Sequence, residues 1–600
     1  MPAQHRIFLN VEQSLQGRPW RDRLDLEALG RAQAIGQLWG HSDLLARVLA
    51  ARGQGPDTVE AYLDPTIRSL MPDPSVLQGM DAAVERLARA VATGETVAVF
   101  GDYDVDGACS SALLATFLQA CGLTCLIHIP DRIFEGYGPN AEAIRSLAAR
   151  GASLLVTVDC GTTSHEPFAE AQALGMDVIV LDHHQAPADL PPVVSIVNPN
   201  RQDDLSGLGH LCATGVVFMT LVALNRALRG QGFWIGSRPA PDLLDLLDLV
   251  ALATVADVVP LTGLNRAFVS KGLIVMRARQ HPGLRALFDC AGANGPPTCQ
   301  HLGYLIGPRI NAGGRIGDAA LGARLLMMSD EGEAAEVAAT LDRLNRERQA
   351  IEAATVEEAV AEAQASLGLA DQGAVIVTAA EGWHAGVVGL VAARLKERFR
   401  RPAFAIALTG KTGTGSGRSI PGVDLGRAVR AAVEAGILVK GGGHAMAAGI
   451  TIAKERLGDF RAFLEHRLTE VVDRARADEA LMIDAALTAG GARVELINQL
   501  EQAGPFGSGN PEPVFALPAH RIVEVAKVGT NHVRVRARAG DGAMVNAIAF
   551  RCADEPLGRG LLAARGEPLH LAGCLSLDRW GGGERVQFRI LDAARPAGRV

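Results

Sequence analysis

Short apolar runs alternate with helix-type patterns between about residues 95 and 182. The runs "TVAVF", "LTCLIHIP", "SLLVTVD" and "MDVIVLD" are predicted strands. The segments "ACSSALLATFLQACG", "NAEAIRSLAARG" and "HEPFAEAQALG" between them are predicted helices. Strands that alternate with helices of about ten to fifteen residues form βαβ units around a parallel sheet. This part of the chain is therefore predicted to be a doubly wound α/β lobe, in which ligands bind beyond the carboxyl ends of the strands.

The chain becomes helical in character after about residue 265. Its longest pattern is "EGEAAEVAATLDRLNRERQAIEAATVEEAVAEAQASLG", with apolar side chains at Val337, Leu341, Leu344 and Ile351. We interpret this stretch as one long helix that joins two lobes. A bundle of two shorter helices is the alternative, because no start or stop signal inside the stretch decides between them.

A second α/β lobe is predicted from about residue 372. "GAVIVTA" and "RPAFAIAL" are typical of strands, and "HAGVVGLVAARLKERF" between them is typical of a helix. The segments "GSGRSIPGVDL" and "GGGHAMAAGI" follow and are expected to be glycine-rich loops. They lack the Gly-Lys-Ser/Thr ending of a P-loop, which argues against ATP binding. Their glycines instead allow the backbone to approach a phosphate closely, with Arg418 and His444 as neighbouring polar groups.

The final part of the chain, from about residue 480, consists of short predicted strands. In "HVRVRARAG" apolar residues alternate with Arg534, Arg536 and Arg538, so that one face is apolar and the other is basic. Residues 519–551 contain six Lys or Arg and two acidic residues. A basic stripe on a small β-barrel suits a nucleic-acid backbone. A solvated edge strand is the simpler alternative.

Composition narrows the class of protein. Hydrophobic residues make up 48% of the 600 and aromatic residues 4%, so the cores must be aliphatic. The most apolar region, "LLDLLDLVALATVADVVPL", is interrupted by three aspartates and predicts no membrane span, and the N-terminus has no apolar run of signal-peptide length. Nine cysteines without a Cys-x-x-Cys pair predict neither a zinc site nor a disulfide framework. A soluble, cytoplasmic protein is expected.

The net charge of −8 argues against a general affinity for DNA, although it leaves room for a local basic groove. Acidic and histidine side chains gather where the predicted strands of the first lobe end and in the segment "TVADVVPL". These residues are Asp102, Asp104, Asp106, Asp159, Asp182, His183, His184 and Asp257. An unpaired buried charge is costly, so their recurrence predicts a metal cage rather than a set of solvated acidic turns.

The stretch "DYDVDG" also matches the beginning of an EF-hand calcium loop. With Asp102 at the first loop position, Gly107 falls on the required glycine, but Leu113 occupies the place of the bidentate glutamate. A predicted strand also stands where an EF-hand has a helix, so this possibility is excluded. Carboxylate and imidazole ligands without thiolates favour Mn²⁺ or Mg²⁺, and their number suffices for two ions about 3.5–4 Å apart. Such a pair predicts phosphoester hydrolysis, in which one of the adjacent histidines ligates and the other faces the substrate or the outer shell.

Several motifs resemble a known family. "DYDVDG", "VTVDCG", "LDHH" and "TVADVVPL" resemble the four ordered motifs of the DHH phosphoesterase superfamily. "IPDRIFEGYG", "GPRINAGGRIGDA", "WHAGVVGLVAARL", "GSGRSIPG", "GGGHAMAAG" and "PFGSGNPEPVF" are similar to segments of its RecJ branch. The resemblance implies a 5′-to-3′ exonuclease that degrades single-stranded DNA to mononucleotides in recombination and repair. It further implies a monomer, with a single-strand-binding protein and a DNA helicase as candidate partners.

The resemblance also implies roles for individual residues. The metal ligands of the family fall on Asp104, Asp106, Asp159, His183 and Asp257, and His184 completes the catalytic set. The substrate contacts fall on Arg132, Tyr137, Arg315, Ser416, Arg418 and His444, which would hold phosphates, including the one at the 5′ end. Asp102 would orient the other aspartates. Phe100 stands where many relatives have a histidine, which predicts a weaker or more hydrated second metal site.

Five regions are expected from the resemblance and the patterns together. They are an N-terminal segment (1–75), a DHH catalytic domain (76–265), a helical region with the long connecting helix (266–370), a DHHA1 domain (371–475) and an OB-like nucleic-acid-binding barrel (480–600). The fold class is thus α/β, with two α/β lobes joined by a long helix and followed by a β-barrel.

Three other functions fit parts of the sequence. A DHH phosphodiesterase that cleaves short oligonucleotides or cyclic dinucleotides needs only the two α/β lobes and leaves residues 480–600 without a purpose. A non-catalytic DNA-binding relative would lack some of the metal aspartates, and none is missing here. A pyrophosphatase would leave the basic barrel unexplained.

Overall fold

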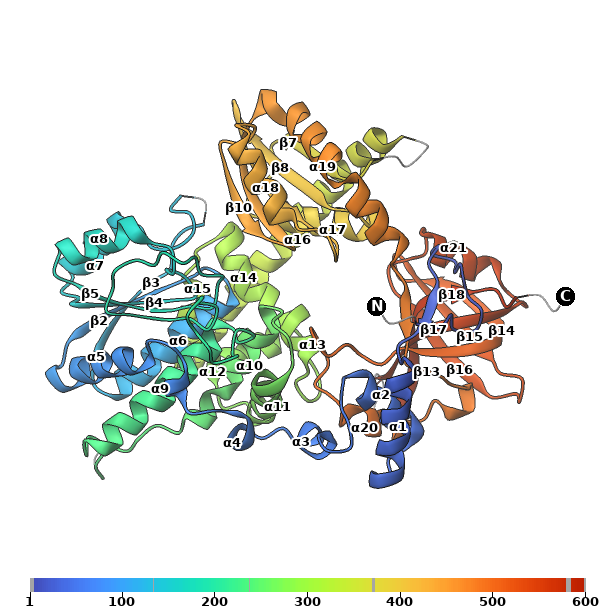
Figure 1. Ribbon diagram of the computed structural model, residues 1–600, viewed down its shortest axis with the longest axis horizontal. Coiled ribbons are helices and arrows are strands. Elements are labelled where there is room, and N and C mark those ends of the chain that lie inside the picture. Colours follow the sequence, from blue (N-terminus) through green and yellow to red (C-terminus); the bar gives the residue numbers. More distant parts are fainter. Residues whose placement is uncertain (1–4, 133, 237, 369–372, 579–583, 598–600) are drawn as a thin grey trace. The chain divides into compact units, whose positions relative to one another are not determined.

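The chain forms two compact units, seen in Figure 1. The computed structural model describes residues 5–132, 134–236, 238–368, 373–578 and 584–597. Met71–Pro260 and Ala267–Asp478 form the first unit, here called the two-sheet unit. Met1–Leu70, Leu261–Arg266 and Glu479–Val600 form the second, here called the barrel unit.

The first sheet of the two-sheet unit is parallel throughout, as predicted. Its strands are β2 (Thr96–Gly101), β3 (Thr124–His128), β4 (Leu154–Val158), β5 (Asp177–Leu181) and β6 (Ser195–Val197), in the order β3-β2-β4-β5-β6. Strands β4 and β5 are continuous apolar runs because helices cover both faces of the sheet. One face carries α7 (Ala141–Ala149) and α8 (His165–Ala173); the other carries α5 (Met80–Thr93), α6 (Val105–Ala120) and α9 (Ala213–Gly230).

The strand order reverses direction next to β2. From β2 the chain crosses to β3 on one side and then returns to β4 on the other side. In open α/β sheets ligands bind at such a switch point, beyond the carboxyl ends of the strands. Asp102 and Asp159 directly follow β2 and β4, so the topology alone brings the first and second acidic motifs together.

A helical region connects the first sheet to the second. It contains α10 (Leu247–Ala256), α11 (Gly263–Arg277), α12 (Pro282–Cys290), α13 (Cys299–His301), a π-helical turn η3 (Leu302–Ile306), α14 (Gly307–Ile316), α15 (Leu321–Leu325) and α16 (Glu331–Leu367). Helix α16 is a single helix of 37 residues, which decides against the alternative of two shorter helices. Asp330 caps its start by accepting a hydrogen bond from the N–H of Glu333.

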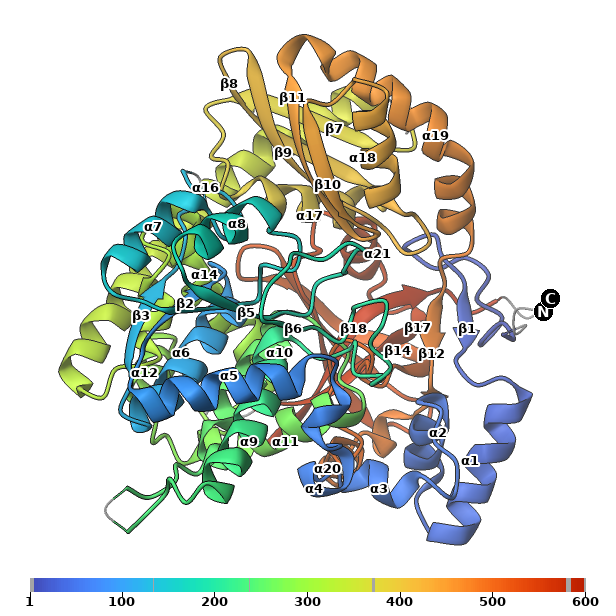
Figure 2. The ribbon, with the colours of Figure 1, turned by 60° about the vertical axis from the view of Figure 1, so that its left-hand side comes forward.

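The second sheet corrects one prediction. The second segment expected to be a glycine-rich loop, 441–450, is mostly strand, and the first begins with strand residues 415–418 before a turn. Strands β9 (Thr412–Arg418), β10 (Lys440–His444) and β11 (Ala447–Ala453) continue antiparallel from the parallel pair β7 (Ile376–Glu381) and β8 (Ala403–Thr409). The glycines make room for large neighbours, since a Cβ on Gly417 would lie 2.5 Å from the Phe404 ring and one on Gly415 would lie 2.7 Å from Ile406. Helices α18 (Leu425–Glu434) and α19 (Leu457–Ala477) cover one face, and α16 and α17 (Val388–Phe399) cover the other (Figure 2).

The barrel unit contains the predicted OB-like barrel. The strands β14 (Phe515–Val528), β15 (His532–Arg538), β16 (Met544–Ala549), β18 (Arg585–Ala594) and β17 (Pro568–Asp578) follow one another, and pairing of β14 with β17 closes the ring. Strand β13 (Ala485–Ala486) extends the sheet beside β14, and α20 (Val494–Glu501) and α21 (Pro556–Ala563) flank it. The alternation seen in the sequence holds in β15, where Val533, Val535 and Ala537 are buried and the arginines between them are exposed.

The N-terminal residues belong to the same unit as the barrel. Strand β1 (Trp20–Asp22) pairs in parallel with β12 (Leu481–Ile483), and Trp20 is fully buried. Helices α1 (Leu26–Trp39) and α2 (Asp43–Ala51) share one apolar core with the barrel strands, and α3 (Val59–Leu63) and α4 (Ile67–Leu70) follow. Across the described parts of the chain, no helix combines the length and the apolar character that crossing a membrane requires.

Candidate metal centre

The loop after β2 is shaped by its own carboxylates. Asp104 caps α6, and its Oδ1 accepts hydrogen bonds from the backbone N–H of Asp106 (2.9 Å) and Gly107 (3.1 Å). The turn requires the glycine, because a Cβ at Gly107 would lie 2.3 Å from the carbonyl oxygen of Asp102. The chain therefore folds back over Asp102 and turns all three motif aspartates toward the end of the sheet.

Asp106 is held by the first turn of α9. Its carboxylate accepts hydrogen bonds from the N–H of Ala213 (2.7 Å), the N–H of Thr214 (2.8 Å) and the hydroxyl of Thr214 (2.6 Å). The N-terminus of a helix favours a negative charge, and these donors fix both carboxylate oxygens. Asp106 is thus held in one fixed orientation at the end of the sheet.

Two residues at the site adopt a left-handed backbone conformation that is uncommon for residues with a side chain. Asp159, which follows β4, has φ 61°, and Val258, which follows Asp257, has φ 60°. Such a conformation is rare for a β-branched residue and persists only where the surrounding structure enforces it. The strained backbone thus lies at Asp159 itself and directly after Asp257, two carboxylates of the cluster.

His183 presents one nitrogen to three carboxylates. Its Nδ1 lies 3.1 Å from the carbonyl oxygen of Leu211 and donates to it, which leaves the lone pair on Nε2. That Nε2 lies 3.4 Å from Asp159 Oδ1, 3.6 Å from Asp257 Oδ2 and 3.8 Å from Asp106 Oδ2. An imidazole whose Nδ1 donates to a carbonyl and whose Nε2 faces carboxylates has the arrangement of a shared metal ligand.

His184 is oriented by a buried carboxylate to which the sequence assigned no individual role. Asp182 accepts hydrogen bonds from the Thr162 hydroxyl (2.6 Å), the N–H of His183 (2.7 Å) and Nδ1 of His184 (2.8 Å). Although burial opposes ionisation, these bonds hold the pKa of Asp182 below its usual range. Burial likewise opposes the charged imidazole, but Asp182 raises the pKa of His184 to about 9, so His184 is a cation at neutral pH.

In the other carboxylates of the cluster, burial and mutual repulsion outweigh the nearby positive charges. Burial first, and then the neighbouring carboxylates, raise the pKa of Asp102 and Asp159 well above the usual range and that of Asp257 to about 9. Oδ1 of Asp102 and Oδ1 of Asp159 are buried and have no hydrogen-bond partner among the residues that the structure describes. Buried acidic oxygens that repel one another and lack donors fit divalent cations.

Three overlapping groups of side chains bring their ligand atoms within 4.8 Å of one another. They are Asp106 with His183 and Asp257, Asp102 with Asp104 and Asp159, and Asp159 with His183 and His184. Oxygen and imidazole donors without a thiolate suit Mn²⁺ or Mg²⁺, so the residues fit the metals that the sequence predicts. Phe100 adds no ligand: its ring is fully buried in the core under α7 and α8, 5.0 Å from the ring of His128.

Arginines from separate parts of the two-sheet unit share one electrostatic neighbourhood. Burial first, and then repulsion from Arg132, Arg348 and Arg418, lowers the pKa of Arg315 to about 10. Arg315 donates to the carbonyl oxygen of Gly386 at 3.1 Å. Partly buried cations that repel one another favour an anion between them.

The other predicted substrate residues lie in the same neighbourhood. The guanidinium of Arg132 lies 4.9 Å from the centre of the ring of Tyr103, which stands in the loop between β2 and α6. Arg418 donates to the hydroxyl of Ser416 at 2.8 Å. Burial, followed by the charges of Arg418 and His184, lowers the pKa of His444, which links the second sheet to the metal centre.

Tyr137 lies at the edge of the metal centre. Its hydroxyl is 3.3 Å from Nδ1 of His184 and 3.4 Å from the carbonyl oxygen of Asp159. The two rings meet edge to face, with their centres 5.8 Å apart. This places a hydroxyl donor beside the charged histidine.

The three arginines of β15 belong to the barrel unit. Arg534 and Arg536 line a groove of about 500 Å³, together with Glu524, Asn546, Arg585 and Gln587. Arg536 forms a 3.4 Å ion pair with Glu524, in which both side chains are at least half exposed. The groove therefore combines basic and amide groups on the surface of the barrel.

The fold and the site define a DHH-type phosphoesterase. The model of the DHH family N-terminal domain matches residues 96–254, that of the DHHA1 domain residues 372–470, and that of the RecJ OB domain residues 483–592. The single-stranded-DNA-specific exonuclease RecJ of Salmonella typhimurium is 37% identical over 84% of this chain and 89% of its own length. The chain belongs to the RecJ family.

Solved structures agree with this assignment. The crystal structure of RecJ from Thermus thermophilus in complex with Mn²⁺ has a TM-score of 0.79 and 29% identity, and the match covers 96% of this chain and 80% of that one. The structure of the same protein with Mg²⁺ has a TM-score of 0.74 and 28% identity, with 96% and 79% covered. The predicted family and fold class are therefore confirmed.

Proposed function

We propose that this chain is a metal-dependent exonuclease that degrades single-stranded DNA from the 5′ end to mononucleotides, in DNA recombination and repair. The observation that carries this proposal is the pairing of two clusters in one unit: buried carboxylates that repel one another, and partly buried arginines that repel one another. A phosphodiester near a chain end satisfies both. Its relatives are named single-stranded-DNA-specific exonucleases, and the crystal structures of RecJ from Thermus thermophilus are complexes with Mn²⁺ or Mg²⁺.

The metal ligands that we propose are Asp104, Asp106, Asp159, His183 and Asp257. Asp102 lies beside Asp104 and Asp159 and orients these neighbours. When bound, a pair of such ions activates water and neutralises the charge that builds up on a phosphate during hydrolysis. The protein contributes fixed positions: α9 clamps Asp106, the Leu211 carbonyl sets the tautomer of His183, and Asp182 keeps His184 charged.

His184 and Tyr137 are proposed to contact the phosphate that is cut. His184 is a cation at neutral pH, and a ring N–H can donate a hydrogen bond to a phosphate oxygen. The hydroxyl of Tyr137 lies beside it and adds a second donor. Donors that are already in place when charge develops on phosphate oxygens stabilise the transition state.

Arg132, Arg315 and Arg418, with Ser416 and His444, are proposed to hold the phosphate at the 5′ end. Guanidinium groups match phosphate oxygens in planar, paired hydrogen bonds. An end-binding pocket beside a metal centre would explain removal of one nucleotide at a time.

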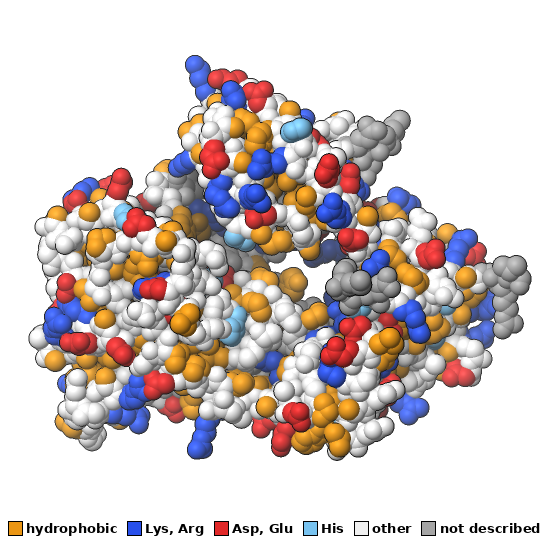
Figure 3. All heavy atoms as spheres, in the orientation of Figure 1, with side chains coloured by type: hydrophobic (Ala, Val, Ile, Leu, Met, Phe, Trp, Pro, Cys, Tyr) orange, Lys and Arg blue, Asp and Glu red, His pale blue; other side chains and the backbone are white. Residues whose placement is uncertain are grey.

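The barrel is proposed to hold the strand by its backbone. Acidic and basic side chains are interspersed over the face of the molecule in Figure 3, so affinity for DNA must come from local groups. Arg534 and Arg536 line a groove, and Arg538 continues their row. We further propose the five domain bounds given above, a monomeric and cytoplasmic enzyme, and single strands supplied by a DNA helicase and covered by a single-strand-binding protein.

The test is digestion of single strands labelled at the 5′ or the 3′ end, with Mn²⁺, beside a blunt duplex. Early release of a mononucleotide from the 5′ label, with the duplex spared, is the expected result. Release from the 3′ label first would contradict the polarity. Cleavage of only di- or trinucleotides would favour the small-substrate phosphodiesterase instead.

A further inference from the structure

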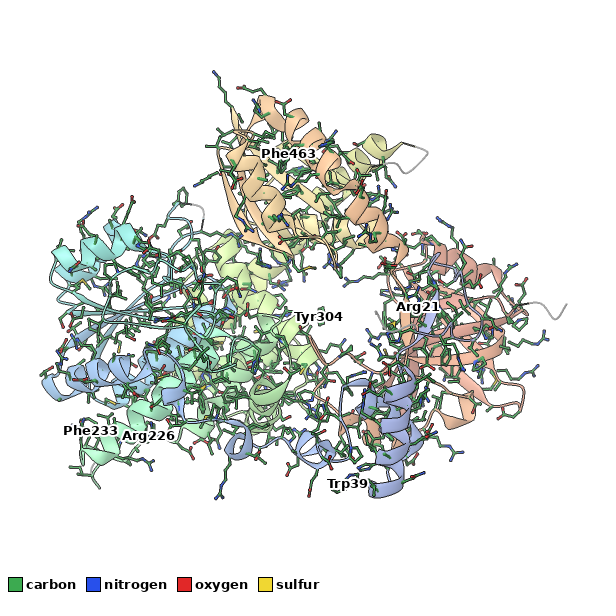
Figure 4. The ribbon with its side chains drawn as sticks, viewed as in Figure 1. Arg21, Trp39, Arg226, Phe233, Tyr304 and Phe463 are labelled. Carbon is green, nitrogen blue, oxygen red and sulfur yellow. The ribbon has the colours of Figure 1, made fainter. Side chains whose placement is uncertain are left out.

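Tyr304 is a large aromatic side chain outside the proposed metal ligands and substrate contacts. It lies in the π-helical turn η3, at the rim of the helical region, and is 78% exposed (Figure 4). No hydrogen bond or ring contact of Tyr304 is found among the described residues. Single π-helical turns are rare and are frequent at functional sites. An exposed ring on such a turn needs an explanation beyond core packing.

The turn η3 lies against the end of α10. A Cβ on Gly303 would be 3.6 Å from Cγ1 of Val255, and one on Gly307 would be 3.4 Å from Cβ of Ala256. Asp257, a proposed metal ligand, is the next residue after Ala256. The residues on both sides of Tyr304 are thus packed against the segment that supplies a carboxylate to the metal centre.

The turn η3 also contacts the beginning of α6. A Cβ on Gly307 would be 3.7 Å from Cγ2 of Val105, which stands between the aspartates at 104 and 106. Tyr304 is three residues before Gly307, or about 4–5 Å along a helix axis. Tyr304 therefore belongs to a turn whose backbone packs against the end of α10 and against the beginning of α6.

Val258 adds a second exposed apolar side chain to this region. It follows Asp257, its φ is 60°, and it is 67% exposed. A strained valine that stays at the surface buries nothing, so its apolar side chain is available to a ligand. An exposed valine and an exposed tyrosine thus flank the end of α10.

We propose that Tyr304 and Val258 form a nucleobase subsite, in which the Tyr304 ring stacks on a base of the bound strand within a few nucleotides of the phosphate that is cut. This inference rests on the proposed function. Every base has an aromatic face, so stacking is tolerant of sequence, as a degrading enzyme requires. In a duplex both faces of each base are covered by neighbouring pairs. The subsite therefore accepts unpaired bases and contributes to the selectivity for single strands.

The subsite is tested by binding, in an Asp159→Asn background that cannot consume the strand. Dissociation constants are measured with Mn²⁺ for strands of one length that carry a single abasic position, moved along the strand nucleotide by nucleotide. With Tyr304 present, we expect affinity to fall about tenfold at one or two positions near the 5′ end. Tyr304→Ala should lose about the same factor on the intact strand and show no further loss at those positions.

Two variants serve as controls. Tyr304→Phe keeps the stacking face and should retain the profile of the parent. Ile274→Ala removes a 52% exposed side chain from α11 of the same unit and should leave affinity and profile unchanged.

Two results would overturn the subsite. One is an unchanged affinity of Tyr304→Ala for the intact strand; the other is a loss that is equal at every abasic position. The digestion assay with unmodified protein distinguishes a failure of the subsite proposal from a failure of the proposed function. If that protein fails to degrade single strands, the function is wrong; if it degrades them and Tyr304→Ala behaves like its parent, only the subsite is wrong.

Discussion

The metal centre and the arginine row of the barrel are both clusters of like charges, but they differ in burial. Asp159 is 2% exposed and its Oδ1 has no hydrogen-bond partner among the described residues, whereas Arg536 is half exposed and paired with Glu524. Water screens exposed charges and weakens their repulsion. Buried charges are not screened, so their repulsion persists until a cation arrives.

This difference separates a chemical site from a binding surface. At the proposed metal centre Asp106 is fixed by α9, and we expect removal of one such group to disable the whole. On the barrel we expect each arginine to act almost alone, with a contribution that adds to those of the others. The following predictions test the contrast, beginning with the largest expected effect.

Asp159→Asn should reduce hydrolysis to below about 1% of the parent while single-strand binding is retained. Asparagine tolerates the left-handed backbone at this position, so the fold is preserved. Removal of a mutually repelling carboxyl should also raise the melting temperature in EDTA. Turnover at fixed Mn²⁺ and thermal unfolding in EDTA check both. Retained hydrolysis would contradict the ligand assignment.

Asp182→Asn should reduce hydrolysis about 10- to 100-fold, because it removes the charge that orients His184 and keeps it protonated. The high-pH limb of the rate profile should move to lower pH, as the pKa of His184 falls from about 9 toward its ordinary value. A profile with an unmoved limb would show that His184 acts without Asp182.

Changing Arg534, Arg536 and Arg538 together to Ala should weaken binding to long single strands about tenfold at low salt and flatten its salt dependence. Each lost phosphate contact lowers the slope of log affinity against log salt by about 0.7. Hydrolysis of the shortest substrates should not change. Arg31→Ala, on α1 of the same unit and paired with Glu27, is the matched control. An unchanged slope would favour the solvated-strand alternative.

The smallest effect concerns stability and pH without metal. The pKa values of Asp102, Asp159 and Asp257 are raised in the folded protein, so the stability that their protonated forms contribute is complete below about pH 4. It should be lost as pH rises through the folded pKa values, which reach about 9 for Asp257. The melting temperature in EDTA should therefore fall between about pH 5 and 9, and Mn²⁺ should remove that slope. A flat profile in EDTA would mean that the carboxylates are compensated within the protein.

The elements of the first sheet could be predicted because their pattern is local. Strands β4 and β5 are continuous apolar runs, and an acidic motif directly follows each of them. The strands within the two glycine-rich segments are not predicted from the sequence, for the opposite reason. Glycine weakens a strand by local propensity, and the side chains that fill its place, such as Phe404 on β8, come from another part of the chain.

The role of Asp182 and the position of the N-terminal residues were also beyond local pattern. Asp182 orients the His184 ring and is itself held by Thr162, twenty residues away. The pairing of β1 with β12 joins Trp20 to Leu481. No periodicity in residues 1–75 indicates that partner.

The sequence by itself determined the parallel sheet, the barrel strands and the residue types of a metal site, because hydrophobic period and turn chemistry act over a few residues. That residues 331–367 form one helix was settled by the structure. The tertiary structure alone decided which carboxylates stay uncompensated, which histidine nitrogen is free, and where Tyr304 is placed. These properties depend on burial and on contacts between distant segments, and both exist only once the chain has folded.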